Sequence, residues 1–284
     1  MTSRGDKVAA KVADLPDWDF AKIEANIADA MRRKQGGPFH VLVATGAMNP
    51  VHRGHVAMLR KVANSPEWQE RGGRVVGGFL SPSHDLYLRG KFGEGNFLPA
   101  TKRAAMVRAA LEGEPLFSLG LYEVRAEGRW PDFPEVATNL GDAVRERFVD
   151  VPVRVWYVCG EDHYTKCHLR RGVTKTIGCC VVARGGKRPV MKRANPDLVI
   201  GVVAEDETDD MSSTKVRMHL ESLQNLCSEG PIDSLLGAVA SDGTGDASSA
   251  AVRGHKDALR SLLPVGTLDL LLSRTQQEEG SQHL

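Results

Sequence analysis

The stretch FHVLVATGAMNPVHRGHVAML, residues 39–59, decides the fold of this chain. Its first seven residues form a short apolar run rich in β-formers, and from residue 53 onward the apolar residues recur with helical spacing. Gly46 and Pro50 lie between the two halves. Glycine lets the backbone turn tightly, and proline suits the start of a helix. The stretch therefore predicts a strand, a tight turn and a helix.

Apolar runs and helical patterns continue to alternate along the chain. The expected strands after the first one are 73–80, 116–124, 153–160, 178–185 and 197–205. The expected helices after the first one are 98–113, 134–148 and 212–223, whereas 81–97 is expected to be a turn and a polar loop. Strands that alternate with helices predict an α/β fold, in which a doubly wound parallel sheet carries helices on both faces.

The composition suggests how this domain is bounded. Residues 1–37 are interpreted as an N-terminal helical extension, and residues 38–224 together with 255–275 as the domain itself. Residues 225–254 contain many Gly, Ser, Ala and Asp residues and few large apolar ones, so we expect a flexible insertion there. The last residues, 276–284, are interpreted as a tail.

The charge balance limits the classes of partner. The 284 residues include 37 Lys and Arg and 36 Asp and Glu, for a formal net charge of +1. Such a balance favours neither a nucleic-acid nor a membrane partner, and no apolar run approaches the roughly 18 residues of a membrane span.

Five cysteines without a CxxC pair indicate reduced thiols. We expect an intracellular protein of the cytoplasm or nucleus; a homo-oligomer is compatible with this sequence.

Small, polar and basic residues follow the expected strands. These residues are Thr45 to Ala47, Ser81 and Pro82, Cys159 and Gly160, Arg184 and Gly185, and residues 206–213. In an open parallel sheet, ligands bind in the crevice at the carboxyl ends of the strands. The pattern therefore predicts a nucleotide site at this edge of the sheet.

His52 and His55 lie three residues apart in the first turn of the expected helix. A helix N-terminus attracts phosphate, and two imidazoles on one face can donate hydrogen bonds to phosphate oxygens. A packed or solvated histidine pair is the alternative interpretation, since short motifs match by chance. A zinc site would need a third ligand, and the H-E-x-x-H pattern is absent. We therefore predict no protein metal site.

Two longer motifs resemble those of the nucleotidylyltransferase superfamily. GAMNPVHRGH, residues 46–55, is similar to G-x-F-x-P-x-[HT]-x-x-H, with Met48 where phenylalanine is usual. MSSTKVR, residues 211–217, is similar to I-S-S-T-x-x-R. Both motifs come in the family's order, and each lies at an expected strand-to-helix junction. This resemblance implies a Rossmann-like fold that binds ATP.

Shorter segments resemble the eukaryotic-type nicotinamide/nicotinate mononucleotide adenylyltransferases within that superfamily. SPSHDLY at 81–87 is similar to SPVxDxY, CGED at 159–162 to C-G-x-D, and VAR at 182–184 to V-x-R. The closing LLPVGTLDLLLSR, residues 262–274, is similar to the family's C-terminal helix. The resemblance covers about residues 38–224 and this last segment.

The resemblance implies the transfer of AMP from ATP, with Mg²⁺, to nicotinamide or nicotinate mononucleotide. The products would be NAD or deamido-NAD and pyrophosphate. The implied catalytic residues are His55, His52 and Arg217. The residues implied to contact ATP or NAD are Gly46, Ala47, Met48, Tyr87, Arg89, Tyr122, Gly160, Asp162, Arg184, Ser213, Thr214 and Lys215.

The chain departs from the family pattern at the base-binding positions. Arg89 follows the tyrosine where the family has a run of lysines, and Tyr122 replaces the first of two stacking tryptophans. The second tryptophan has no counterpart, and Trp130 and Trp156 are interpreted as packing residues. Tyrosine can still stack on a flat ring.

Several alternatives remain open for single residues and for the function. Gly160 can be a tight turn, Asp162 a helix cap, Tyr122 a core residue and Arg184 a solvated charge. A transferase with pantetheine phosphate, FMN or a choline-type phosphate as acceptor is one rival, and the SPxxDxY and CGxD matches argue against it. A non-catalytic nucleotide-binding regulator is another, and retention of both histidines and Arg217 argues against it.

Overall fold

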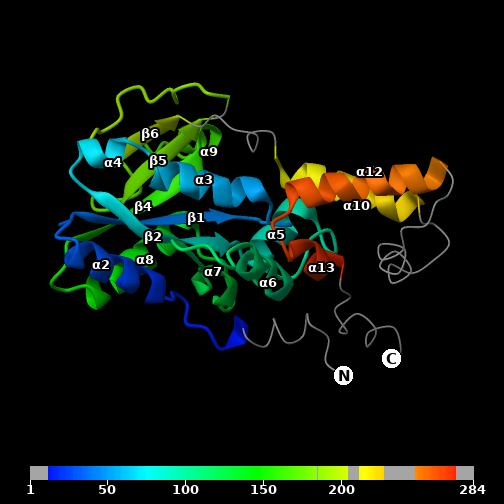
Figure 1. The fold of residues 1–284 in the computed structure, drawn as a ribbon, viewed down its shortest axis with the longest axis horizontal. Helices are drawn as coiled ribbons and strands as arrows, with labels where there is room; N and C mark the ends of the chain where they lie inside the picture. Colours follow the sequence, from blue (N-terminus) through cyan, green and yellow to red (C-terminus); the bar gives the residue numbers. More distant parts are fainter. Residues whose placement is uncertain (1–11, 184, 204–210, 227–246, 273–284) are drawn as a thin grey trace.

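The computed structural model describes residues 12–183, 185–203, 211–226 and 247–272. Within these residues, six parallel strands form one sheet (Figure 1). The strands are β1 (Phe39–Gly46), β2 (Arg74–Pro82), β3 (Phe117–Leu119), β4 (Val153–Gly160), β5 (Gly178–Ala183) and β6 (Val199–Val203). Their order is β3-β2-β1-β4-β5-β6, with every neighbouring pair parallel. This is the order of the Rossmann-type doubly wound sheet, so the predicted fold class is confirmed.

Helices cover both faces of the sheet, as Figure 1 shows. The helices described are α2 (Ala21–Arg32), α3 (Arg53–Ala63), α4 (Glu67–Glu70), α5 (Asp85–Phe92), α6 (Ala100–Ala110), α7 (Tyr122–Arg125), α8 (Phe133–Arg147), α9 (Glu161–Lys166), α10 (Ser213–Leu226), α12 (Ala247–Leu262) and α13 (Thr267–Leu272). Helices α2 and α8 contribute buried residues to one face, and α3, α6 and α12 to the other. No helix in the described ranges has the length and apolar character that a bilayer crossing requires.

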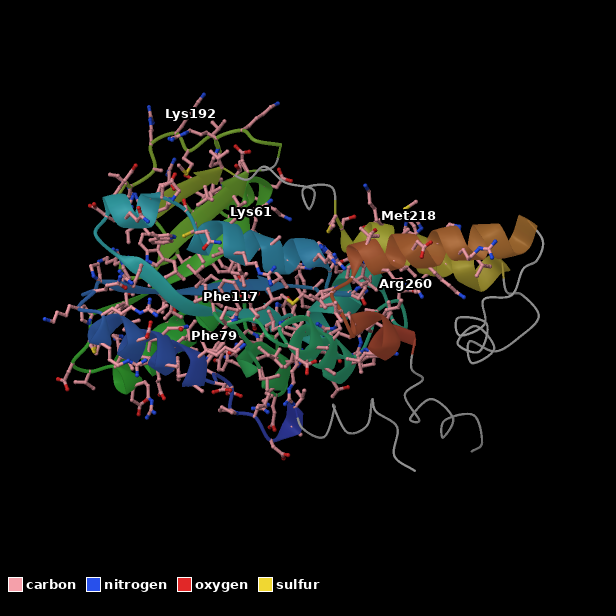
Figure 2. All side chains as sticks on the ribbon, viewed as in Figure 1. Lys61, Phe79, Phe117, Lys192, Met218 and Arg260 are labelled. Carbon is pink, nitrogen blue, oxygen red and sulfur yellow. The ribbon has the colours of Figure 1, made fainter. Side chains whose placement is uncertain are left out.

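The strands are apolar throughout because both of their faces are covered. In β1, Phe39, Val41 and Val43 belong to one buried cluster, while Leu42 and Ala44 belong to the other. Figure 2 shows Phe79 and Phe117 inside the molecule, and each again belongs to a different cluster. Strands buried on both faces lose the apolar–polar alternation of surface strands. This explains why the continuous runs in the sequence predicted a parallel sheet correctly.

Helix α2 belongs to the domain, whereas the sequence had suggested an extension over residues 1–37. Its side chains Ile23, Ile27 and Ala30 are buried in the same cluster as residues of β1 and α8. Asn26 also donates a hydrogen bond from Nδ2 to the carbonyl oxygen of Val76 in β2 (2.9 Å). The helix thus contributes side chains to the core, so the predicted boundary after residue 37 does not separate two structural units.

Two predicted loop segments and one predicted strand also differ from the structure. Helix α5 lies in the segment expected to be a polar loop; it is short, and Leu88 is its one buried residue. The strand expected over 116–124 ends at Leu119, and Tyr122–Arg125 is a helical turn. Helix α12 begins at Ala247, inside the predicted insertion, while residues 227–246 lie outside the described residues.

His40 is a buried histidine between two tryptophans at the amino end of the sheet. It is 4% exposed, its ring lies 4.6 Å from that of Trp68, and its Nδ1 accepts a hydrogen bond from Trp156 Nε1 (3.1 Å). Burial, with smaller contributions from Arg154 and Arg71, lowers the pKa of His40 to about 4. The ring is therefore neutral in the folded protein, and Trp156 is a core residue as predicted.

This environment predicts a loss of stability in acid. Below pH 6.5 the unfolded chain binds a proton at His40 that the folded protein rejects down to about pH 4. The free energy of unfolding should therefore fall by about 2 kcal/mol from pH 7.5 to pH 5 through this group alone. His40→Gln, which keeps an acceptor for Trp156, should remove that part of the pH dependence. Urea unfolding at both pH values measures it, and an unchanged dependence in the variant would contradict the assignment.

Candidate active site

The turn after β1 presents backbone groups toward the carboxyl edge of the sheet. Met48 has a φ of +46°, which is uncommon outside glycine, and its side chain is buried in the core. Its backbone is therefore the part of Met48 that can reach a ligand. Helix α3 follows, with His52 as its N-cap residue. The strand, turn and helix predicted from residues 39–59 are confirmed.

The two histidines of this turn pack against each other. The backbone N–H of His52 donates a hydrogen bond to Nδ1 of His55 (3.1 Å), and the ring centroids lie 3.8 Å apart. Because Nδ1 of His55 accepts this bond, the neutral ring carries its proton on Nε2. His52 is buried, whereas His55 is half-buried. His55 can thus offer an N–H donor at the start of a helix.

The second predicted motif docks directly on this first turn. Ser213 Oγ donates to the carbonyl oxygen of Pro50 (2.8 Å), and Arg217 Nη1 donates to that of Asn49 (2.7 Å). Arg217 also bonds the Thr214 hydroxyl (3.1 Å). Helix α10 begins at Ser213. The structure therefore brings the starts of α3 and α10 to one turn, although 163 residues separate Pro50 from Ser213.

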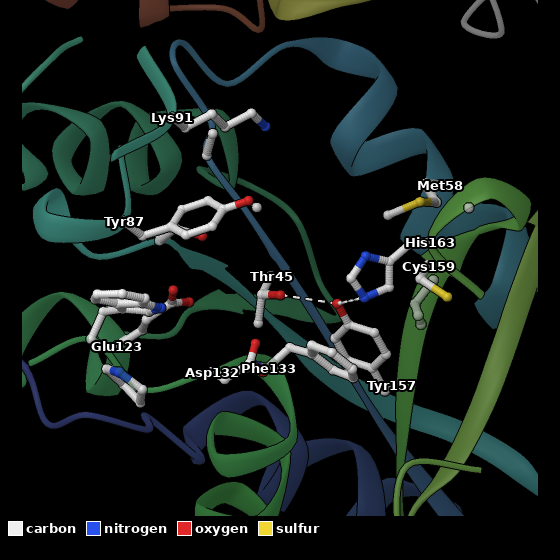
Figure 3. Close-up of a pocket in the computed structure, with 17 residues that line it drawn as sticks. Thr45, Met58, Tyr87, Lys91, Glu123, Asp132, Phe133, Tyr157, Cys159 and His163 are labelled. Carbon is white, nitrogen blue, oxygen red and sulfur yellow. Dashed lines mark hydrogen bonds between the residues drawn. The ribbon is translucent and has the colours of Figure 1, made fainter. Parts of the chain in front are cut away.

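A cavity of about 270 Å³ opens beside the turn, at the carboxyl ends of β1 and β4 (Figure 3). Its lining includes small residues of the turn, several aromatic rings and several ionisable side chains. These are Thr45, Gly46, Ala47, Met58, Ser83, Tyr87, Lys91, Glu123, Trp130, Pro131, Asp132, Phe133, Tyr157, Val158, Cys159, Gly160 and His163. The strand order reverses between β1 and β4, which is where doubly wound sheets bind their ligands.

A hydrogen-bonded chain of side chains closes one side of this cavity. The hydroxyls of Thr45 and Tyr157 lie 3.0 Å apart, and Tyr157 Oη lies 3.3 Å from Nε2 of His163, as the dashed lines of Figure 3 mark. Phe133 stacks on Tyr157 at 4.9 Å between ring centroids. Burial raises the pKa of Tyr157 and lowers that of His163, so both groups are neutral near pH 7. The result is a fixed wall of neutral rings.

The predicted site residues divide into three groups. Gly46, Ala47, Tyr87 and Gly160 line the cavity. Those at the adjoining junction of the two motifs are Met48, His52, His55, Ser213, Thr214, Lys215 and Arg217. Those that belong neither to the cavity lining nor to the junction are Arg89, Tyr122 and Asp162. Arg184 lies outside the described residues.

Arg89 and Tyr122 have other partners. Arg89 forms an exposed ion pair with Glu94, with 2.6 Å between Nε and Oε2. Tyr122 stacks on Trp18, with ring centroids 6.4 Å apart, and donates its hydroxyl to Glu135 (3.0 Å). The core alternative considered for Tyr122 therefore describes its place in the structure.

Several cavity residues were not singled out from the sequence. Lys91 lies two residues beyond Arg89 and lines the cavity in its place. Trp130, expected to be a packing residue, is 49% exposed at the cavity. Glu123 was hidden because its segment was taken as the end of a strand, whereas α7 turns it inward. The feature of the sequence that could have indicated an exposed Trp130 is its position before Pro131 in a polar loop.

Glu123 is a buried carboxyl with one unsatisfied oxygen. Its Oε1 accepts a weak hydrogen bond from the backbone N–H of His84 (3.3 Å), while Oε2 is buried without a hydrogen-bond partner. Burial raises the pKa of Glu123 to about 8, against the opposing effects of Ser83, the His84 N–H and Arg103. The cavity therefore contains an acid that is largely protonated at neutral pH.

Arg103 fixes the turn from behind. This fully buried side chain donates to Asp85 Oδ1 (2.5 Å), to the Leu98 carbonyl (2.8 Å) and to the Ala47 carbonyl (3.1 Å). It thus connects α6, the start of α5 and the turn after β1. A buried charge with all of these partners positions the backbone that faces the cavity.

A comparison with protein families identifies the family of this chain. The family model described as cytidylyltransferase-like matches residues 43–219, which is more than half of the chain and includes both long motifs. The chain belongs to the cytidylyltransferase-like family. This membership confirms the superfamily that the two motifs predicted.

A curated relative and two solved structures resemble parts of this cytidylyltransferase-like protein. Nicotinamide/nicotinic acid mononucleotide adenylyltransferase 2 of Danio rerio is 32% identical over 74 residues, which is 25% of this chain and 22% of the relative. The match thus spans about a fifth of the relative's length. Nicotinic acid mononucleotide adenylyltransferase of Plasmodium falciparum, complexed with APC, gives a TM-score of 0.48 at 10% identity and covers 82% of this chain and 94% of its own. Its complex with NaAD gives 0.47, with the same identity and coverage.

Two arginine substitutions test how the cytidylyltransferase-like site is supported. Arg103→Met should lower the free energy of unfolding by about 3 kcal/mol or more, because it removes a fully buried cation and its hydrogen bonds to Asp85 and to the Leu98 and Ala47 carbonyls. Arg89→Met removes an exposed ion pair and should cost less than about 1 kcal/mol. Denaturant unfolding of both variants measures the difference. Equal losses would show that Arg103 does not hold the turn.

Proposed function

We propose that this protein transfers AMP from ATP to a pyridine mononucleotide, forming NAD or deamido-NAD and releasing pyrophosphate. The observation that carries the proposal is the docking of Ser213 and Arg217 on the carbonyl oxygens of Pro50 and Asn49. This docking joins two helix starts at the turn whose residues Gly46 and Ala47 line the cavity. Family membership and the name of the Danio rerio relative support the same reaction.

The triphosphate of ATP would bind at the junction of α3 and α10. Helix N-termini offer free N–H groups and a partial positive charge to phosphate oxygens. His55 adds an Nε2 donor, and Arg217 adds a planar cation whose geometry suits two phosphate oxygens. Ser213, Thr214 and Lys215 belong to the same helix start. Together these groups can neutralise charge on the triphosphate.

The mononucleotide would occupy the cavity beside this junction. Lys91 lines the cavity and can supply a cation for the mononucleotide phosphate. Tyr87, Trp130 and Phe133 offer aromatic faces or edges to a flat ring. Gly160 leaves open space at the end of β4, since an added Cβ would meet nothing within 4 Å. A ribose can therefore approach the backbone there.

The reaction needs no activated protein nucleophile. An oxygen of the mononucleotide phosphate, which is already ionised, forms a bond to the α-phosphorus of ATP. The bond from that phosphorus to the oxygen bridging to the β-phosphorus breaks, and pyrophosphate leaves with the electron pair. The residues of the chain would align the two phosphates and stabilise the charge that grows on the leaving group. We assign the second task to His55 and Arg217.

Mg²⁺ would enter with ATP as part of the substrate. Among the residues that the structure describes, no group of three or more His, Cys, Asp or Glu side chains is arranged to hold a metal ion. Mg²⁺ commonly retains several waters and binds mainly through substrate phosphates. We therefore propose that the chain contacts the triphosphate oxygens. The oligomeric state, the compartment and the lack of nucleic-acid partners stay predictions from the sequence.

A panel of acceptors tests the proposed function. Pyrophosphate release should be measured with MgATP and, in turn, nicotinamide mononucleotide, nicotinate mononucleotide, pantetheine phosphate, FMN and choline phosphate, with MgCTP replacing MgATP as a donor control. At least one of the pyridine mononucleotides should exceed pantetheine phosphate, FMN and choline phosphate by about 100-fold in kcat/KM. Faster turnover of another acceptor, or of CTP, would replace the proposal, and no turnover at all would support a regulator.

His55→Ala tests the role of the first turn. The variant should lower kcat by on the order of 10²–10³-fold, because the lost donor would act mainly on charge in the transition state. The matched control is Arg53→Ala on the same turn, since Arg53 donates to the Leu263 and Arg260 carbonyls. This control should retain kcat within about fivefold. Near-normal turnover by a folded His55→Ala protein would remove the histidine from the mechanism.

A further inference from the structure

We propose that Glu123 recognises the substituent on the pyridine ring and makes the site prefer the carboxamide of nicotinamide mononucleotide over the carboxylate of nicotinate mononucleotide. This inference rests on the proposed function and concerns the choice of acceptor. It starts from an atom, Oε2 of Glu123, that is buried without a hydrogen-bond partner while its side chain lines the cavity. Such unsatisfied oxygens are uncommon in folded proteins.

The cavity places this oxygen next to surfaces that suit a flat ring. Tyr87 and Trp130 line the same cavity as Glu123, and both are substantially exposed. Figure 3 shows Glu123 and Tyr87 on the same side of the cavity, across from His163. A ring that packs on these aromatic groups would carry its substituent into the region of Glu123. A donor on that substituent would satisfy Oε2.

The two substituents differ in the hydrogen-bond donors that they can offer to Glu123. A carboxamide has two N–H donors, and a carboxylate has none. Glu123 can accept from a carboxamide whether it is ionised or protonated. A carboxylate can bind beside Glu123 only if Glu123 keeps its own proton to donate, because two adjacent carboxylates repel. The pyridinium ring, which is cationic in both mononucleotides, also favours an acidic neighbour.

The charged and titratable groups around Glu123 do not reverse this preference. Arg103 of α6 faces the carboxyl, but its donors are directed to Asp85 and to two backbone carbonyls. Asp132 at the start of α8 adds negative charge, and Tyr157 of β4 is neutral. Because the pKa of Glu123 is raised to about 8, its proton is lost as the pH rises above that value. The preference for the carboxamide should therefore grow between pH 7 and pH 9.

The test is the ratio of kcat/KM for nicotinamide mononucleotide to that for nicotinate mononucleotide, measured at pH 7 and pH 9 with saturating MgATP. The wild-type ratio should exceed about tenfold at pH 9 and be lower at pH 7. Glu123→Gln offers both a donor and an acceptor, so it should reduce the ratio at pH 9 by about tenfold and make it independent of pH. Calorimetric titration with each mononucleotide should show the same change in relative affinity.

Two variants serve as controls. Glu114→Gln makes the same change at a buried glutamate that pairs with Arg60 and lies outside the cavity lining, and it should keep the wild-type ratio. Asp132→Asn removes the other acid of the cavity and should keep the dependence on pH. If Asp132→Asn abolished that dependence and Glu123→Gln did not, recognition would belong to Asp132 and the inference would be wrong.

The outcomes separate this inference from the proposed function. Equal or faster use of the carboxylate by the wild-type protein would overturn the inference and leave the function standing. A wild-type ratio that is the same at pH 7 and pH 9 would also overturn it, even if Glu123→Gln failed to fold. Turnover of neither mononucleotide at either pH would overturn the proposed function and the inference with it.

Discussion

The structure depends on two backbone carbonyls, those of Asn49 and Pro50. They accept hydrogen bonds from Arg217 and Ser213 at the start of α10, a helix that follows the whole sheet in the sequence. These bonds fix where a late helix meets an early turn. They bring the two helix starts close enough for phosphate oxygens to contact both, and buried Val216 anchors α10 in the core.

The sheet explains why this junction lies beside a cavity. Strands β1 and β4 are neighbours, and the chain runs outward from them in both directions, so the helices after each strand diverge. The divergence opens the space that Gly46, Tyr157 and Gly160 line. Arg103 supports the same turn from the other side through the Ala47 carbonyl. The site is therefore held by the core rather than by its own surface loops.

The sequence predicted those parts of the fold and site that follow from local pattern. Buried strands, the turn after Gly46 and each of the two motifs leave a signature in a few adjacent residues. The place of α2 in the core was not predictable in this way, because amphipathic spacing does not say which surface a helix covers. Helix α5 was not predicted because it is short and buries only Leu88. Consequently Lys91, on that helix, was overlooked in favour of Arg89.

The remaining differences arise from tertiary contacts. Glu123 and Trp130 enter the cavity through a helical turn and a loop whose directions depend on Arg129, Glu135 and Tyr122. The residues adjacent to them in the sequence do not predict that these two side chains point into the cavity. Tyr122 was expected to face the ligand, but its stacking on Trp18 turns it toward the opposite side of the same segment. Of the two adjacent residues in α7, Glu123 therefore reaches the cavity and Tyr122 does not.

The most direct test is steady-state kinetics of Arg217→Ala and Arg217→Lys with each substrate varied in turn, together with direct binding of ATP. If the α10 junction holds the triphosphate, Arg217→Ala should retain very little activity and Arg217→Lys some, because lysine keeps the charge without the planar fork. Both should impair ATP binding more than binding of the mononucleotide. If Arg217→Ala raised only the KM for the mononucleotide, the junction of the two motifs would bind the mononucleotide and not the triphosphate, which would contradict the proposed site.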